Sequence, residues 1–262
     1  MEFRTIVDIP KPDFEIAPCE EMLFVGSCFA TEIGRRFQEE KFRAVVNPYG
    51  VMYNPASILH TVERWTTSPC VVFLTLGTNH IYRLKETGEI VDNCQKRPQS
   101  LFTEEELSVD ACADYLQKTI NILRQRNPEV NIVLTVSPIR YRKYGYHESQ
   151  LSKATLLLAV EKVTGATYFP AYEIVNDELR DYRFYKEDML HPSDQAVEYI
   201  WQRLSEVYLS AEAKAFLKEW APLKAVLNHK PFDPDSEEYR TLMDKTMLKV
   251  AALQKKYPNF AV

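Results

Sequence analysis

Residues 22–30 read MLFVGSCFA. The first four are apolar without interruption, which is typical of a buried parallel strand, and Gly26 and Ser27 end the run. Apolar residues then recur at helical spacing from Phe29 to Phe42, so a helix is expected directly after the strand. The stretch therefore predicts a strand followed at once by a helix, the building block of an α/β fold.

The same alternation continues along the chain to about residue 210. Further buried strands are predicted at residues 70–76, 131–137 and 166–169. Helices are predicted at residues 54–65, 103–126, 149–165, 171–179 and 193–209, with a hairpin or irregular insertion at 80–102. Such a pattern forms a parallel sheet covered on both faces, with active-site residues beyond the carboxyl ends of the strands.

Residues 211–262 carry no strand signal. Two charged amphipathic helices are predicted there, at residues 211–227 and 236–256. We therefore divide the chain into an α/β domain, residues 1–210, and a helical extension, residues 211–262, that packs on it. The extension also offers a surface through which two copies of the chain could form a homo-oligomer.

Composition excludes several classes of protein. The chain has 262 residues but only 7 glycines, where average usage of about 7% predicts roughly 18. No two glycines are adjacent or separated by a single residue, which excludes the glycine-rich loops that bind dinucleotides and nucleoside triphosphates. The net charge is −5 and no long run of Lys and Arg occurs, so no nucleic-acid partner is expected. No apolar run reaches about 18 residues, so no membrane span is expected.

The cysteines and histidines show no metal-binding pattern. The five cysteines are an odd number and include no C-x-x-C spacing, which argues against a zinc ribbon or a redox motif. The five histidines are scattered along the chain. We therefore expect no metal and no cofactor, and a reduced, cytoplasmic setting.

Asp188 and His191 form the most informative pair of residues. Of the five histidines, only His191 has an acidic residue three positions earlier. A carboxylate that accepts from one imidazole nitrogen leaves the other nitrogen free as a base. The alternative is a surface turn that caps the following helix at Ser193, and the spacing by itself favours neither interpretation.

Ser27 and Cys28 lie at the junction between the first strand and its helix. The N-terminus of a helix stabilises a thiolate and lowers the pKa of a thiol, so Cys28 is a candidate nucleophile. Ser27 beside it would need an adjacent base to act. The alternative for Cys28 is a small residue packed under a tight turn, since cysteine is often simply buried.

Other polar residues are predicted at the same edge of the sheet. Asn79 follows the second strand and carries an amide donor for a developing oxyanion, and backbone N–H groups near Gly50 and Cys28 would add to it. The alternative for Asn79 is ordinary turn chemistry. Arg83 and Arg140 lie on loops near the strand ends and would face an anionic substrate.

Residues 26–30 read GSCFA, the signature for which a family of bacterial proteins is named. The chain resembles this GSCFA family over roughly residues 20–210, including residues 137–140 and 150–154. The family in turn resembles the SGNH, or GDSL-type, hydrolase superfamily. The resemblance implies a three-layer α/β/α sandwich with a parallel, flavodoxin-like sheet.

The resemblance also implies roles for individual residues. The four sequence blocks of SGNH hydrolases fall on residues 26–28, Gly50, residues 77–79, and Asp188 with His191. In those enzymes a serine is the nucleophile, the glycine and the asparagine hold the oxyanion, and the histidine is the base. Here Cys28 takes the place of the serine, and His80 takes the place of the aspartate that ends the third block.

We therefore expect an ester hydrolase or acyltransferase that forms an acyl-enzyme on Cys28 or Ser27, with His191 oriented by Asp188. SGNH relatives often remove acyl groups from carbohydrates, so the resemblance implies an O-acylated carbohydrate or another small ester as the substrate. The alternative is a non-catalytic binding or scaffold protein on the same fold, which would bind a ligand without turnover.

Overall fold

A computed structural model describes residues 3–92 and 97–260. At its centre lies a five-stranded parallel sheet in the order β2-β1-β3-β7-β8. The strands are β1 (Glu21–Gly26), β2 (Arg43–Val46), β3 (Val71–Leu76), β7 (Asn131–Val136) and β8 (Thr167–Tyr168). Counted within the sheet, this is the order 2-1-3-4-5 of flavodoxin-like folds. The expected fold class is confirmed.

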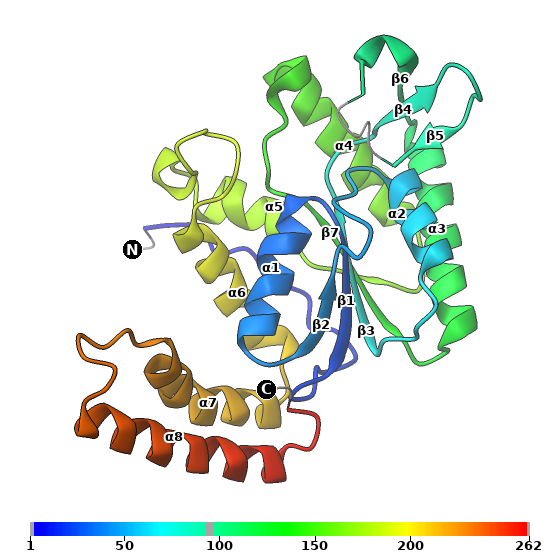
Figure 1. Ribbon diagram of the computed structural model, residues 1–262. Helices are drawn as coiled ribbons and strands as arrows, with labels where there is room; N and C mark the ends of the chain where they lie inside the picture. Colours follow the sequence, from blue (N-terminus) through cyan, green and yellow to red (C-terminus); the bar gives the residue numbers. More distant parts are fainter. Residues whose placement is uncertain (1–2, 93–96, 261–262) are drawn as a thin grey trace.

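Helices cover both faces of the sheet (Figure 1). One layer contains α1 (Cys28–Glu39) and α6 (Asp194–Tyr208), and the other contains α2 (Pro55–Arg64), α3 (Val109–Arg126) and α4 (Tyr146–Lys162). Successive side chains of a strand point to opposite faces. Met22 and Phe24 of β1 accordingly pack in the core on the α1 side, whereas Leu23 and Val25 pack on the α2 side.

A small antiparallel sheet, β5-β4-β6, follows the end of β3. Its strands are β4 (His80–Leu84), β5 (Ile90–Val91) and β6 (Phe102–Glu106). The helix predicted over residues 103–126 is confirmed for Val109–Arg126, but its predicted start is wrong, because residues 103–106 pair with β4 and α3 begins only after its cap, Ser108. Three successive glutamates resemble the first turn of a helix, but the ion pair of Glu105 with Arg83, at 3.0 Å, supports the strand instead.

Short helical turns complete the α/β part. They are η1 (Gln99–Leu101), η2 (Arg142–Tyr144), α5 (Ala171–Glu173), η3 (Ile174–Glu178) and η4 (Tyr182–Phe184). Of these, η3 is a π-helix, a rare form that is frequent at functional sites. The edge strand β2 was not predicted, since its four residues form no distinct apolar run.

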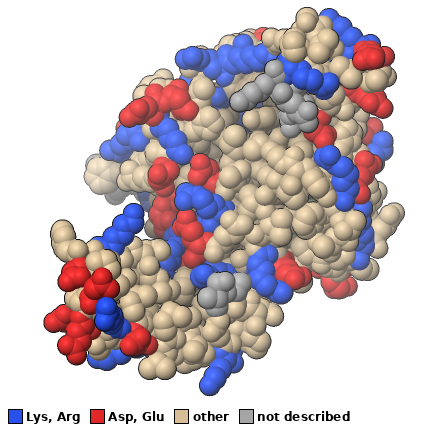
Figure 2. Space-filling view, in the orientation of Figure 1, with Lys and Arg blue, Asp and Glu red and all other residues tan. Residues whose placement is uncertain are grey.

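The C-terminal helices α7 (Ala211–Asn228) and α8 (Glu237–Lys256) pack on each other through a separate apolar cluster that also includes Cys19, which precedes β1. Trp220 Nε1 donates to the carbonyl of Glu39 at 3.2 Å, so α7 lies against the end of α1. Acidic side chains gather over the turn between the two helices and the first turn of α8 (Figure 2). In the described ranges, no helix combines the length and the apolarity that a membrane crossing requires.

Candidate active site

A tight turn after β1 places Cys28 at the first residue of α1. Gly26 has a φ of +140°, and a Cβ atom there would lie 2.1 Å from the carbonyl oxygen of Thr75 on the neighbouring strand. Only glycine fits this position. The N–H of Ser27 donates to the same carbonyl at 3.0 Å, so the chain passes from strand to helix within two residues.

Ser27 serves as the N-cap of α1. Its Oγ accepts from the N–H of Phe29 at 3.2 Å and is hydrogen-bonded to Thr75 Oγ1 at 3.1 Å, and the residue is only 2% exposed. The hydroxyl therefore already satisfies a first-turn amide of the helix. Cys28, in contrast, is a partly exposed free thiol at the positive end of the helix, where a thiolate is stabilised.

Cys28 lines a cavity of about 410 Å³ at the carboxyl ends of β1, β3 and β7. The wall consists of Ser27, Cys28, Tyr53, Gly77, Thr78, Ser137, Ile139, Arg140, Tyr141, Arg142, Lys143, Leu190 and His191. Three of these side chains are cationic, and none of the described lining residues is a carboxylate. Of these, Lys143 already pairs with Glu104 at 3.0 Å, which leaves Arg140 and Arg142 to favour an electron-rich or anionic group.

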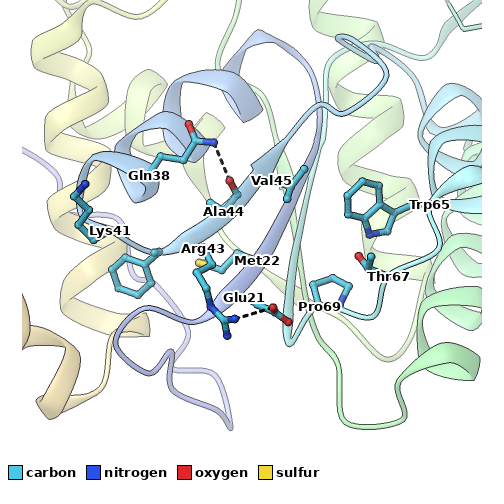
Figure 3. A pocket seen from close by; sticks show the side chains of 11 residues that line it. Glu21, Met22, Gln38, Lys41, Arg43, Ala44, Val45, Trp65, Thr67 and Pro69 are labelled. Carbon is cyan, nitrogen blue, oxygen red and sulfur yellow. Dashed lines mark hydrogen bonds and ion pairs between the residues drawn. The ribbon is translucent and has the colours of Figure 1, made fainter. Parts of the chain in front are cut away.

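A larger cavity, of about 570 Å³, lies at the opposite end of the sheet, beside the amino ends of β1 and β2 (Figure 3). Much of its wall is apolar and comes from Met22, Phe42, Val45, Trp65 and Pro69. Of its two cations, Lys41 and Arg43, the arginine pairs with Glu21 at 2.9 Å, and the described residues that line the cavity include no histidine or cysteine. Ligands of such folds bind beyond the carboxyl ends of the strands, so the smaller cavity is the candidate site.

Asp188 and His191 form a hydrogen-bonded pair in the loop before α6. Asp188 Oδ2 lies 2.6 Å from His191 Nδ1, while Oδ1 accepts from the backbone N–H groups of Leu190 and His191 at 2.8 and 3.0 Å. These donors, the backbone amides first, lower the pKa of Asp188 to about 2. Because Nδ1 is turned to the carboxylate, Nε2 is left to act as a base. Ser193 caps α6, as the alternative interpretation also expected, so Asp188 both holds the turn before this helix and orients the imidazole.

Tyr53 is the partner of the thiol in this structure. Cys28 Sγ lies 4.0 Å from Tyr53 Oη, and within residues 3–92 and 97–260 it makes no hydrogen bond with His191, although both line the cavity. Burial and the neighbouring Cys28 raise the pKa of Tyr53 to about 12, so the phenol keeps its proton at neutral pH. A protonated phenol can donate to negative charge that develops beside it. Sequence reasoning missed Tyr53, whose only signal is its place in the loop after β2.

Arg140 lies in the cavity wall, where its guanidinium group is already engaged. The group lies over the rings of Tyr146 and Tyr185, at 4.3 and 5.4 Å from their centroids. Nη1 donates to the carbonyl of Met189 at 3.1 Å, and the backbone N–H donates to that of Leu190 at 2.9 Å. Arg140 thus ties the loop that carries the Asp–His pair to the segment after β7.

The structure does not bring three of the predicted residues into the cavity formed by the described residues. Asn79 is 3% exposed, and its Nδ2 donates to the carbonyl of Leu107 at 2.9 Å. The N–H of Gly50 donates to the carbonyl of Asn47 at 2.9 Å within a turn. Arg83 lies on β4 and is held by its ion pair across the small sheet. Each of these groups is therefore used by the local fold.

Two segments of the chain match models of a single protein family. Residues 21–70 and 66–204 match the GSCFA family, and residues 220–262 match the C-terminal domain of GSCFA domain proteins. No curated protein gives a significant match.

Similar solved structures include three esterases. One is an acetylxylan esterase from Geobacillus stearothermophilus, with 13% identity and a TM-score of 0.46 over 75% of this chain and 98% of that one. The others are a carbohydrate esterase of family 3 from Talaromyces cellulolyticus (11%, 0.42, 76% and 99%) and the psychrotrophic esterase EstA from Pseudoalteromonas sp. (15%, 0.40, 77% and 98%). Identities this low leave the reaction to be argued from the residues of this chain.

Proposed function

The chain belongs to the GSCFA family, and we propose that it is an ester hydrolase whose nucleophile is Cys28. One observation carries the proposal: a thiol at a helix N-terminus and an imidazole oriented by a carboxylate line the same cavity. The helix end favours the thiolate, and the imidazole can take its proton. The cap formed by Ser27 supports this choice of nucleophile, since its hydroxyl would have to release the N–H of Phe29 to react.

In the first step, His191 Nε2 takes the Cys28 proton while the sulfur attacks the acyl carbon, so that a C–S bond forms and the carbonyl electrons move to oxygen. The N–H of Cys28, a first-turn amide without an intrahelical acceptor, and the hydroxyl of Tyr53 would stabilise this oxyanion. The C–O bond then breaks, and the alcohol leaves with the proton from His191. Water attacks the thioester, gives a proton to His191, and releases the acid; this proton returns to the thiolate.

The alcohol part of the substrate is assigned to a second cavity, of about 460 Å³, that shares Arg140 with the first. Part of its wall comes from the π-helix η3, and Tyr172, Tyr182 and Tyr185 add aromatic rings with hydroxyl groups. The wall also includes the amide side chains of Gln150 and Asn176 and the charged side chains of Asp177, Arg180 and Asp181. Aromatic faces with a few polar groups suit a polyhydroxylated ring, which supports an O-acylated carbohydrate as the substrate.

The test compares hydrolysis of p-nitrophenyl acetate and of an acetylated monosaccharide by the wild type and two cysteine variants. Cys28→Ala is expected to lower turnover by at least about a thousandfold, because no nucleophile remains. Cys70→Ala, at the other end of β3, is the matched control and should retain full activity. Acid-quenched wild type should carry an acyl group on Cys28 in peptide mass spectra. Turnover that survives Cys28→Ala, or an acyl group on Ser27, would contradict the proposed nucleophile.

Binding without turnover is the second candidate, because the donors of Asn79 and Gly50 are engaged outside the cavity. In that case the wild type and Cys28→Ala would bind the acetylated monosaccharide equally well, and neither would release acetate. Calorimetric titration beside the ester assay separates the two functions.

A further inference from the structure

We propose that Lys153 is a positioning residue. It sets the spacing between the side of the cavity that carries Cys28 and the side that carries His191, because its ammonium group binds one main-chain carbonyl on each side. The inference rests on the proposed function, in which Cys28 is the nucleophile and His191 the base. None of the acyl-transfer steps uses this lysine directly.

Lys153 lies on the inner face of α4 and is 3% exposed. Its Nζ donates to the carbonyl of Gly77 at 2.6 Å and to that of Ser137 at 2.8 Å, the residues that directly follow β3 and β7. In the described ranges it forms no ion pair with a carboxylate, and burial lowers its pKa to about 7. An unpaired ammonium group is costly to bury. The two carbonyls, rather than a counter-ion, therefore account for the position of this side chain.

Two serines on the same face of α4 hold the neighbouring main chain. Ser152 Oγ accepts from the N–H of Asn79 at 3.0 Å, and Ser149 Oγ accepts from the N–H of Tyr141 at 3.2 Å. Residues three and four positions apart share a helix face, so the two serines and Lys153 act together. The helix thus anchors both turns that form the floor of the cavity.

Gly77 connects Lys153 to the nucleophile side. Its N–H donates to the carbonyl of Tyr53 at 2.9 Å, and a Cβ atom on it would lie 2.9 Å from that oxygen and 3.3 Å from the Cβ of Ser27. The Gly77 peptide therefore packs between Tyr53 and Ser27. Tyr53 carries the hydroxyl near the thiol, and Ser27 is the cap of the helix that begins with Cys28. A shift of Gly77 would move both.

Ser137 connects Lys153 to the base side. Its Oγ accepts from the N–H of Ile139 at 3.3 Å, and the next residue, Arg140, holds the carbonyls of Met189 and Leu190. That loop carries the Asp–His pair. Lys153 is therefore the side chain that joins the two halves of the site across adjacent strands, and a misplacement of about 1 Å between reacting groups can cost roughly a hundredfold in rate.

The test measures the reaction of the Cys28 thiol with iodoacetamide across pH 5 to 10, with the site mapped by mass spectrometry and folding checked by thermal melting. Lys153→Met removes both hydrogen bonds and should slow alkylation of Cys28 by about tenfold or more and change its pH profile, because Tyr53, the partner of the thiol, and the loop that carries His191 shift relative to Cys28. Lys153→Gln keeps an N–H donor but is one atom shorter than lysine, so its bonds to the two carbonyls are weakened and its alkylation rate should lie between those of the wild type and Lys153→Met. Lys162→Met, on the exposed part of the same helix, is the matched control and should match the wild type.

A folded Lys153→Met protein with the wild-type alkylation profile would overturn the inference, since a merely structural lysine changes melting alone. Should Lys153→Met fail to fold, Lys153→Gln decides: a folded protein with a slowed profile supports the inference, and a folded protein with the wild-type profile overturns it. Absence of ester turnover in the wild type would count against the proposed function and leave this comparison intact.

Discussion

Replacing Lys153 with methionine should change how the stability of the protein depends on pH. In the folded protein burial lowers the pKa of Lys153 to about 7, whereas an unfolded lysine titrates near about 10.4. Between these values the unfolded chain binds a proton that the folded chain does not, so raising the pH stabilises the folded state. Methionine binds no proton, and the variant lacks this contribution.

The size of the effect follows from the two pKa values. Each pH unit inside the window contributes up to about 1.4 kcal/mol. Because the buried lysine is still half protonated near pH 7, the wild type should gain roughly 1.5 kcal/mol from about pH 7 to about pH 8.5. For a chain of this size that corresponds to roughly 3–6 °C in Tm. The raised pKa values of Cys19, Cys70 and Cys112 act in the opposite direction at higher pH, but the variant shares them.

Urea unfolding followed by tryptophan fluorescence gives the free energy of unfolding at both pH values. The difference between wild type and Lys153→Met should grow by roughly 1.5 kcal/mol in favour of the wild type as the pH rises. The difference between wild type and Lys162→Met, the control on the same helix, should stay constant. A difference between wild type and Lys153→Met that is equal at both pH values, or that narrows, would refute the lowered pKa of Lys153.

Three further predictions concern the site. Ser27→Ala should lower the free energy of unfolding, measured in urea, by about 1 kcal/mol, because α1 loses its cap. Iodoacetamide should still label Cys28 in this variant. Loss of labelling would implicate the serine hydroxyl in the chemistry. Asp188→Asn should lower kcat by roughly 10²–10⁴-fold with little change in KM, because the imidazole loses its orienting carboxylate; an unchanged kcat would remove the Asp–His pair from the mechanism. Asn79→Ala should cost about 1–3 kcal/mol of stability yet change kcat by less than about threefold, and a large fall in kcat would return Asn79 to the oxyanion site.

The central strands were predictable because they are buried on both faces. β1, β3 and β7 lie in the middle of the sheet, so almost every side chain is apolar and the run stands out from its surroundings. β2 is an edge strand of four residues, two of which are only partly buried, and it has no such run. β6 is glutamate-rich and becomes a strand only because β4 lies beside it, an interaction that local sequence does not contain.

The residues of the candidate site were likewise predictable only where their contacts are local in the sequence. Asp188 and His191 were found because their contact is local and depends only on a spacing of three residues. Asn79 was assigned from its place after a strand, but the partner of its amide, Leu107, is set by tertiary packing. Lys153 lies within residues 150–154, where the chain resembles the family, but no role was predicted for it, since a lysine in a helix usually faces water. Its spacing from Leu156 did carry information. Residues three positions apart share a helix face, and Leu156 lies in the core, so the spacing indicates that Lys153 faces inward.

The polar groups at the end of β3 serve the fold, which leaves Tyr53 as the side-chain donor beside the sulfur. Asn79 is tied to other segments by main chain and side chain, whereas Gly77 gives its carbonyl to Lys153 and its N–H to Tyr53. Lys153 and Tyr53 therefore act on Cys28 along one chain of contacts. The double variant Lys153→Met with Tyr53→Phe should slow alkylation of Cys28 no more than the slower single variant does, because coupled residues are not additive. Multiplicative effects of the two substitutions would show that Lys153 reaches the thiol by another path.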